Sequence, residues 1–244
     1  MSVTFEDVLA AREKIQDSII RTPTIKATRL SLHLGIELYL KLENLQHTSA
    51  FKARGALNKL LTLSEEQRKK GVIACSAGNH AQGVAYNATR LGIPSVIVMP
   101  NGTPFNKIKR TEDFGAKVVL HGNNFEESVG ETLRLAEVDD LTFIHPFDDD
   151  AVVAGQGTLG LEMMEQVPDL DVIVVPIGGG GLIAGVATAV KGINPNVKIV
   201  GAQAENFDAV LAMREGRAFT GGEATIAEGI AVKDTGPAAL AIMR

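Results

Sequence analysis

Short apolar segments alternate with amphipathic segments along the chain from Gly71 onward. The apolar segments have the length of strands, and apolar residues in the segments between them recur at helical spacing. Near-continuous apolar strands separated by helices are typical of a parallel sheet that is buried on both faces. We therefore predict an α/β fold built on a parallel sheet. The expected strands are 72–76, 95–99, 117–120, 141–144, 172–177 and 197–204, and the expected helices are 81–91, 105–114, 125–136, 151–166 and 182–193.

The first 70 residues show a less regular pattern. Apolar residues at helical spacing predict a helix over residues 5–20, which should end before Pro23 because proline disfavours helical geometry in the residue that precedes it. Residues 37–43 alternate between apolar and polar, which predicts a strand with one exposed face. With 244 residues, the chain is long enough to bury a substantial core.

Charge and composition argue against several classes of protein. The net charge is −5 and the basic residues are scattered, so we expect no nucleic-acid surface. The sequence has no apolar run of about 18 residues that would predict a membrane helix and no secretory signal at its N-terminus, so a cytoplasmic location is expected. Cys75 is the only cysteine, which excludes an internal disulfide. Its apolar surroundings favour a buried, unreactive thiol over a nucleophile.

Three loops are candidates for a ligand site. Parallel α/β sheets bind ligands at the carboxyl ends of their strands, in the loops that lead into helices. The candidate loops are the four glycines at 178–181, the sequence Ser-Ala-Gly-Asn-His at 76–80, and the turn at 48–56, which contains Lys52.

The four glycines at 178–181 follow the most apolar segment of the chain and precede an expected helix. Glycine lets the backbone approach an anion closely, and the amides at a helix N-terminus attract that anion, so this loop predicts a phosphate site. A flexible hinge or simple close packing is the alternative interpretation. Dinucleotide binding is a weaker interpretation. Gly179, Gly181 and Ala184 loosely fit the glycine pattern of dinucleotide-binding loops, and Glu205 follows at roughly the right distance for a ribose contact.

The other two loops also have functional and structural interpretations. Residues 76–80 could direct a hydroxyl, an amide side chain and backbone amides at a carboxylate or a ring oxygen, or they could simply cap a helix. Lys52 lies between Phe51 and a group of small residues, where a desolvated amine would have a lowered pKa and could form an imine. The alternative is an ordinary solvated lysine. Arg54 is expected to be structural or ion-paired.

Four segments, taken together and in order, resemble the threonine dehydratase and serine racemase group of pyridoxal-phosphate enzymes of fold type II. The segments are Asn44-Leu45-Gln46 with Thr48 to Ala56, Ser76 to Gly83, Ala154 to Thr158, and Pro176 to Leu182. Their separations are similar to those of the family across essentially the whole chain. The likeness is greatest to the catabolic threonine dehydratase type.

The resemblance implies a two-lobed fold of the tryptophan synthase β type, in which a small lobe, 71–147, is inserted into a large lobe made of 1–70 and 148–244. Pyridoxal 5′-phosphate would lie in the cleft, with its ring hydroxyl on Asn79 and its ring beside Phe51. The implied cofactor-binding residues are Phe51, Lys52, Asn79, Gly178, Gly179, Gly180, Gly181 and Leu182, and Lys52 would be the catalytic residue that attaches the cofactor. The implied substrate-binding residues are Ser76, Ala77, Gly78, Asn79 and His80.

The implied reaction converts L-threonine or L-serine into 2-oxobutanoate or pyruvate and ammonia. Lys52 would take the α-proton and the cofactor would act as electron sink. Serine racemases have a second serine that delivers a proton where this chain has Ala77, so racemisation is not expected. The sequence Asn-Asn-Phe at 123–125 also resembles the dehydratases rather than the arginine-bearing segment of the racemases.

Three features depart from the family pattern. Ala50 stands where most relatives have a serine two residues before the lysine. Glu205 resembles the first carboxylate of the family's cation site, and backbone oxygens near Ala209 could join it. However, Leu211 stands where the next acidic residue of that site is expected. The turn whose serine binds the ring nitrogen is not found before Arg244, which predicts that this sequence is part of a longer polypeptide.

The expected partner is a small hydroxy amino acid. The resemblance also implies a homodimer or homotetramer and a place in amino-acid metabolism, such as isoleucine biosynthesis. An alternative is a weakly active or non-catalytic fragment that serves as a binding or assembly module. A nicotinamide-dependent dehydrogenase is disfavoured because it leaves Lys52 and the 76–80 loop unexplained.

Overall fold

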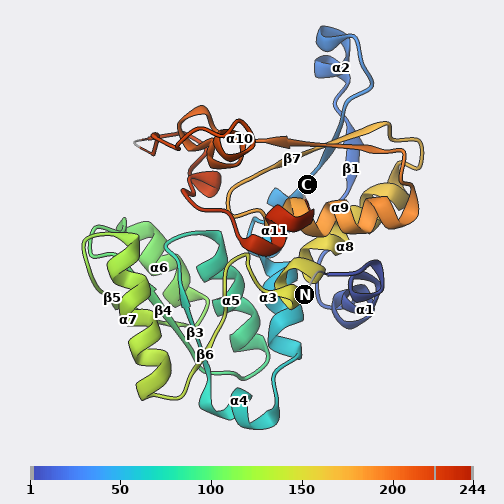
Figure 1. The fold of residues 1–244 in the computed structure, drawn as a ribbon. Coiled ribbons are helices and arrows are strands. Elements are labelled where there is room, and N and C mark those ends of the chain that lie inside the picture. Colours follow the sequence, from blue (N-terminus) through green and yellow to red (C-terminus); the bar gives the residue numbers. More distant parts are fainter. Residues whose placement is uncertain (1–2, 223, 243–244) are drawn as a thin grey trace.

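The computed structural model describes residues 3–222 and 224–242. A four-stranded parallel sheet forms one body of the molecule, at the lower left of Figure 1, with the strand order β5-β4-β3-β6. Its strands are β3 (Val72–Cys75), β4 (Ser95–Met99), β5 (Lys117–Leu120) and β6 (Thr142–Phe143). Its helices are α5 (Asn79–Arg90), α6 (Phe105–Asp113) and α7 (Phe125–Val138).

The strand order determines which face each helix of this sheet covers. The chain moves outward from β3 to β4 to β5 and then returns to β6 on the far side of β3. Because parallel crossovers are right-handed, α5 and α6 lie on one face and α7 on the other. Every residue of β3 is buried, as the apolar run predicted.

The second body is mainly helical. It contains α1 (Phe5–Ile15), α3 (Lys52–Leu61), α8 (Asp150–Gln166), α9 (Gly181–Ile193) and α11 (Pro237–Ile242). The parallel pair β7 (Val172–Pro176) and β8 (Lys198–Ala202) adjoins α9, and η2 (Glu205–Phe207), α10 (Ala209–Arg214) and η3 (Glu228–Ile230) follow. Helix α8 is central because it packs against α1, α3 and α9, while α3 also packs against α5 and so joins the two bodies.

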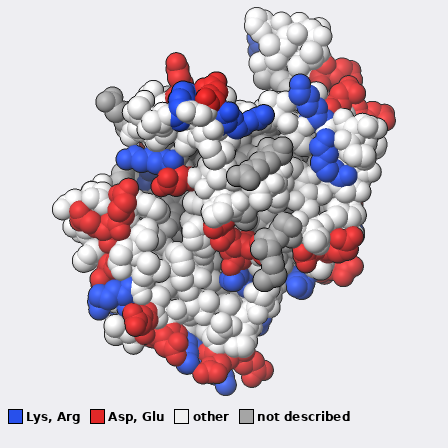
Figure 2. Space-filling view, in the orientation of Figure 1, with Lys and Arg blue, Asp and Glu red and all other residues white. Residues whose placement is uncertain are grey.

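The remaining elements lie between α1 and α3 in sequence, or follow α3. They are β1 (Thr24–Lys26), α2 (Thr28–Leu34), β2 (Tyr39–Lys41), the single turn η1 (Glu43–Leu45) and α4 (Glu65–Lys70). The strands β1 and β2 pair antiparallel, and α2 between them projects from the molecule at the top of Figure 1. Figure 2 shows that this projection carries few charged side chains, and Leu32 on it is 81% exposed.

Glycines allow α8 to lie very close to α3 and α9. A Cβ atom on Gly185 of α9 would lie 2.3 Å from the Val153 carbonyl oxygen and 2.6 Å from the Gly157 amide nitrogen of α8. A Cβ atom on Gly155 of α8 would lie 2.7 Å from the Cα atom of Gly55 in α3. No other residue leaves enough room at these crossings, since the neighbouring atoms belong to backbones that cannot rotate away.

The burial of several strands and the end of the first helix differ from the expectation: β5 and β8 also have exposed residues. The strand at 172–177 was expected to be buried on both faces, which is wrong for β7: Val172 is 46% and Val174 63% exposed, because no described element covers that face of the β7–β8 pair. The helix expected to reach residue 20 ends at Ile15. Beyond that point the backbone of Ile20 bonds to the Gln46 side chain and not within a helix. The Ile20 amide donates to Gln46 Oε1 at 3.0 Å, and Gln46 Nε2 donates to the Ile20 carbonyl oxygen at 2.9 Å.

Candidate active site

Lys52 is the first residue of α3 and follows a constrained turn. Ser49 in that turn has φ +57°, a left-handed conformation that costs non-glycine residues about 1 kcal/mol or more and is common at functional sites. Phe51 lies beside the lysine, with the Lys52 Nζ 5.5 Å from the centre of the phenyl ring. The turn therefore places Lys52 at the N-terminus of α3, beside the phenyl ring of Phe51.

The Lys52 amine lies deep among protein atoms, although part of its side chain is exposed. Its Nζ donates a hydrogen bond of 2.6 Å to the carbonyl oxygen of Pro146. Burial lowers the pKa of Lys52 to about 8, because the charged form loses its hydration. With this pKa about one-tenth of the amine is unprotonated at pH 7, far more than for an ordinary lysine, and that form can act as a nucleophile.

The loop 178–181 lies at the start of α9. Gly180 has φ +90°, which favours glycine. Ala184 is the first residue of α9 whose amide donates within the helix, to Gly180 at 3.0 Å, so the amides of the preceding turn lack partners inside the helix. Those amides and the helix dipole make the loop suited to an anion.

A short strap, residues 145–148, brings Lys52 and the glycine loop together. Pro146 accepts the hydrogen bond from Lys52, and the next residue, Phe147, packs against the loop so closely that a Cβ atom on Gly179 would lie 2.2 Å from its ring. The imidazole Nδ1 of His145 accepts a 2.8 Å hydrogen bond from the Asp148 amide and so shapes the strap. The expected lysine and the expected phosphate loop thus flank the same two residues.

The 76–80 loop lies at the carboxyl end of β3 and leads into α5. Ser76 Oγ accepts a 3.1 Å hydrogen bond from the Gly78 amide, and Asn79 is exposed at the first position of α5. A Cβ atom on Gly229 would have the Asn79 side-chain nitrogen 3.8 Å away, and one on Gly178 would lie 3.2 Å from the Ile230 Cα. Residues 229–230 therefore lie near both the 76–80 loop and the glycine loop.

His80 is buried and its Nε2 lies 2.9 Å from the Ile144 carbonyl oxygen. Since a carbonyl only accepts, Nε2 carries the proton and Nδ1 is an unprotonated acceptor, which has no hydrogen-bond partner. Burial and the neighbouring Lys52 charge lower the His80 pKa to about 3, so the ring stays neutral. The His80 side chain in this state offers no hydrogen to a carboxylate, whereas the backbone amides at the start of α5 do.

The two residues predicted to hold a cation, Glu205 and Ala209, lie in the short helices that follow β8. Glu205 is exposed in η2, and Ala209 begins α10. Within residues 3–222 and 224–242, no group of three or more His, Cys, Asp or Glu side chains is arranged to hold a metal ion. A cation at Glu205 stays a prediction. Nor does any helix in the described ranges have the length and apolar character needed to cross a bilayer.

Cys75 is 1% exposed on β3, and burial raises the pKa of its thiol to about 11. We expect the folded protein to resist iodoacetamide at pH 8, because thiolate is the reactive form and almost none is present. Mass spectrometry before and after denaturation in urea measures this directly. Complete alkylation of the folded chain, with its circular dichroism spectrum unchanged, would contradict the expectation.

Comparison with known proteins assigns this arrangement to a family. The family described as pyridoxal-phosphate dependent enzyme matches residues 15–244. The chain belongs to this family of pyridoxal-phosphate dependent enzymes. Pyridoxal phosphate carries an aldehyde and a phosphate, for which the Lys52 amine and the glycine loop, on the two sides of the strap, are the candidate partners.

Individual relatives give a more detailed picture. The chain is 51% identical over 236 residues to an L-threonine ammonia-lyase of Thermotoga maritima. The matched region is 96% of this chain and 59% of that protein. It is 44% identical over 225 residues to the L-threonine dehydratase catabolic TdcB of Escherichia coli, covering 92% of this chain and 67% of that protein. Among solved structures, maize serine racemase superposes with a TM-score of 0.95 at 34% identity, over 100% of this chain and 74% of the other.

The side chains present fit pyridoxal phosphate. Lys52 provides an amine that is partly unprotonated at neutral pH, and Gly178 to Leu182 provide free amides at a helix N-terminus for a phosphate. A Cβ atom on Gly179 would lie 2.2 Å from the ring of Phe147, so the loop needs glycine here to lie against the strap. The dinucleotide interpretation of the glycine loop gains no such support, since it gives Lys52 no part.

Sequence reasoning missed two groups that shape this site. His145 was not singled out, because a lone histidine followed by Pro-Phe has no recognisable spacing. Asn87 was missed as well, although its side chain donates a 2.9 Å hydrogen bond to the Ala53 carbonyl oxygen and so holds the backbone next to Lys52. A polar side chain on the buried face of an amphipathic helix was the available signal for Asn87.

Proposed function

We propose that this chain carries the catalytic core of a pyridoxal-phosphate dependent ammonia-lyase, which converts L-threonine or L-serine into a 2-oxo acid and ammonia. One observation carries the proposal: the buried amine of Lys52 and the glycine loop contact adjacent residues of one strap, at Pro146 and Phe147. The similarity to two L-threonine ammonia-lyases or dehydratases supports the reaction. The small lobe would be 71–147, between the two parts of the large lobe at 1–70 and 148–244.

The cofactor, when bound to Lys52, supplies an electron sink for the bond electrons at the substrate's α-carbon. The glycine loop would hold its phosphate through backbone amides, Asn79 would bind the ring hydroxyl and Phe51 would pack beside the ring. Lys52 would then exchange protons at the α-carbon, for which a pKa of about 8 is well matched to neutral pH.

The substrate carboxylate would bind at the start of α5. The backbone amides of residues 79 and 80 lie at a helix N-terminus, where an anion is stabilised, and the Ser76 hydroxyl, which accepts from the Gly78 amide, lies beside them. Ala77 lies in the same loop and carries no transferable proton. This favours elimination over racemisation, even though a serine racemase is a close structural neighbour.

The proposal is tested by supplying the chain with pyridoxal phosphate and L-threonine. We expect 2-oxobutanoate and ammonia in equal amounts, and pyruvate and ammonia from L-serine. A racemase would instead accumulate D-serine, which chiral chromatography detects. A chain that binds the cofactor but forms neither a 2-oxo acid nor D-serine would overturn the proposal in favour of a binding or assembly module.

Further properties stay predictions at this point. They are self-association into a dimer or tetramer, a cytoplasmic location, and a cation near Glu205 and Ala209. A role in isoleucine biosynthesis gains no support from the Escherichia coli relative, whose name describes a catabolic enzyme.

A further inference from the structure

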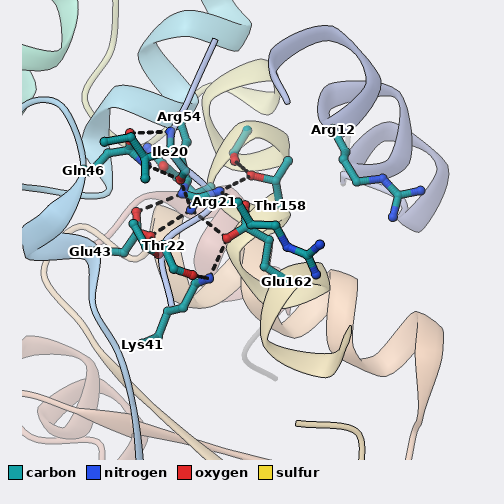
Figure 3. A network of polar contacts seen from close by, with 12 residues as sticks. Arg12, Ile20, Arg21, Thr22, Lys41, Glu43, Gln46, Arg54, Thr158 and Glu162 are labelled. Carbon is teal, nitrogen blue, oxygen red and sulfur yellow. Dashed lines mark hydrogen bonds and ion pairs between the residues drawn. The ribbon is translucent and has the colours of Figure 1, made fainter. Parts of the chain in front are cut away.

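Arg54 lies two residues after Lys52 and belongs to a buried group of charges (Figure 3). Its side chain is fully buried, and it donates to both oxygens of Glu43, each at 2.8 Å. It also donates to both oxygens of Glu162, at 2.6 and 2.9 Å. Glu162 accepts a further hydrogen bond of 2.5 Å from Lys41. We call Arg54, Glu43, Glu162 and Lys41 the Arg54 cluster.

The Arg54 cluster ties together segments that are distant in sequence. Arg54 is on α3, Glu43 on η1, Lys41 on β2 and Glu162 on α8. Neutral groups accept the remaining hydrogen bonds of the cluster. Arg54 donates to the Thr158 hydroxyl at 3.3 Å and to the Ile20 carbonyl oxygen at 3.4 Å. Lys41 donates to the Thr22 carbonyl oxygen at 2.6 Å and to the Gln166 side-chain oxygen at 3.1 Å.

Stability alone does not account for such a cluster. Removing charges from water is costly, and replacing a buried ion network by apolar residues of similar volume is often neutral or stabilising. A planar guanidinium that binds two carboxylates does something an apolar side chain cannot, because it accepts only one orientation of each partner. The Arg54 cluster thus fixes the position of α3 more strictly than apolar packing would.

The position so fixed is that of the helical turn which carries Lys52. Successive residues of a helix are about 100° apart, so Lys52 and Arg54 point to roughly opposite sides of the first turn of α3. Arg54 holds the side toward α8 and η1, while Lys52 reaches the Pro146 carbonyl oxygen on the other. A rotation of this turn would move both side chains together.

Close backbone contacts leave rotation as the remaining freedom of this turn. A Cβ atom on Gly83 of α5 would lie 3.1 Å from the Lys52 carbonyl group, and the Asn87 side chain binds the Ala53 carbonyl oxygen. On the opposite side, a Cβ atom on Gly55 would lie 2.6 Å from the Val152 carbonyl oxygen of α8. Helices α5 and α8 therefore prevent the turn from shifting sideways.

We propose that Arg54 is a positioning residue for Lys52: its paired hydrogen bonds to Glu43 and Glu162 set the rotation of the first turn of α3 and thereby hold the Lys52 amine at the strap. This inference rests on the proposed function, in which Lys52 attaches the cofactor. Two positive and two negative charges in the cluster sum to zero, so Arg54 acts through geometry and not through its electric field.

The burial of the Lys52 amine can be followed without the cofactor, through the pKa of that amine. Competitive acetylation with trace acetic anhydride over a range of pH, followed by peptide mass spectrometry, gives the pKa of each lysine in the folded chain. The titratable groups that face Lys52 are His80 from α5 and His145 from the strap, and burial lowers the pKa of both. We expect Lys52 in the unchanged chain to titrate near 8.

Arg54→Lys keeps the charge but cannot form paired hydrogen bonds to both oxygens of two carboxylates, because an ammonium has only three donors and no planar fork. We expect the Lys52 pKa in this variant to rise by about one unit or more, because a rotated turn exposes the amine to water. Pyridoxal phosphate binding, followed by its absorbance, should weaken at least about tenfold. Glu43→Gln, which removes one carboxylate oxygen and its charge, serves if Arg54→Lys does not fold. It should also weaken cofactor binding and raise the Lys52 pKa, although the lost negative charge alone would lower that pKa, so a rise in this variant reports the rotated turn.

Arg134→Lys is the matched control, since Arg134 makes a paired contact with Glu131 on the exposed surface of α7. It should leave the Lys52 pKa and cofactor binding unchanged. A purely structural role for Arg54 would lower the melting temperature of the variants while the Lys52 pKa stayed near 8, and that result would overturn the positioning role. Failure of the unchanged chain to bind the cofactor at Lys52 would instead overturn the proposed function, and the acetylation profiles would still test the positioning role.

Discussion

Replacing Lys52 with methionine is expected to abolish covalent attachment of the cofactor and to lower the rate of 2-oxo acid formation by at least about 10³-fold, because both the amine and its proton transfer are lost. The same variant is expected to be more stable than the unchanged chain, by about 2 kcal/mol at pH 7. The Lys52 pKa of about 8, against an ordinary 10.5, corresponds to about 1.4 kcal/mol per unit. The lost hydrogen bond to Pro146 and the partial exposure of the side chain reduce the gain.

The stability gain should depend on pH. Between pH 8 and 10.5 the unfolded chain keeps a proton on Lys52 that the folded chain has released, so the Lys52 contribution to the stability of the unchanged chain rises with pH across this window. The advantage of Lys52→Met should therefore be largest below pH 8 and shrink toward pH 10.5. Urea unfolding at both ends of this range measures it.

Lys69→Met on the exposed surface of α4 is the control for this pair of effects, and it should change neither activity nor stability appreciably. A Lys52→Met variant that is less stable than the unchanged chain at pH 7 would show that the amine is not held at an energetic cost. Retained turnover would show that another residue performs the chemistry.

Replacing Gly185 with alanine is expected to destabilise the chain by about 3 kcal/mol or more. The new Cβ atom would lie 2.3 Å from the Val153 carbonyl oxygen and 2.6 Å from the Gly157 amide nitrogen, and both are backbone atoms of α8. Helices α8 and α9 would have to separate, and these helices carry Glu162 and the last residue of the glycine loop. Thermal unfolding followed by circular dichroism gives the change.

Gly130→Ala provides a control with the same chemical change. Gly130 lies on α7, where a Cβ atom meets nothing within 4 Å. Alanine should stabilise this helix by about 0.5 to 1 kcal/mol, since glycine loses more backbone freedom on folding. Similar melting temperatures for the two alanine variants would contradict the close approach of α8 and α9.

The sequence predicted the order and type of most helices and strands because their apolar spacing is a local property. It could not predict the exposed face of β7, since the apolar pattern of Val172 and Val174 does not show which neighbours cover a strand. The end of α1 was misplaced for a related reason. Residue 20 is held by Gln46, and a contact between residues so far apart in sequence leaves no periodic pattern.

The candidate site was predicted in its parts but not in its arrangement. Lys52, the 76–80 loop and the glycine loop were all identified from small residues and their place after strands. The contact of Phe147 with Gly179 and the proton position on His80 depend on the packed structure. The partners of Arg54 could not be named either, although Arg54 was expected to be structural or ion-paired.

Lys52 is the residue that we expect to attach pyridoxal phosphate. The direct test is to incubate the chain with pyridoxal phosphate at neutral pH, reduce with borohydride and map the modified lysines by mass spectrometry. The low pKa and the adjacent glycine loop predict stoichiometric labelling at Lys52, ahead of the surface lysines. Labelling confined to other lysines of the folded chain, with Lys52 unmodified, would contradict the account.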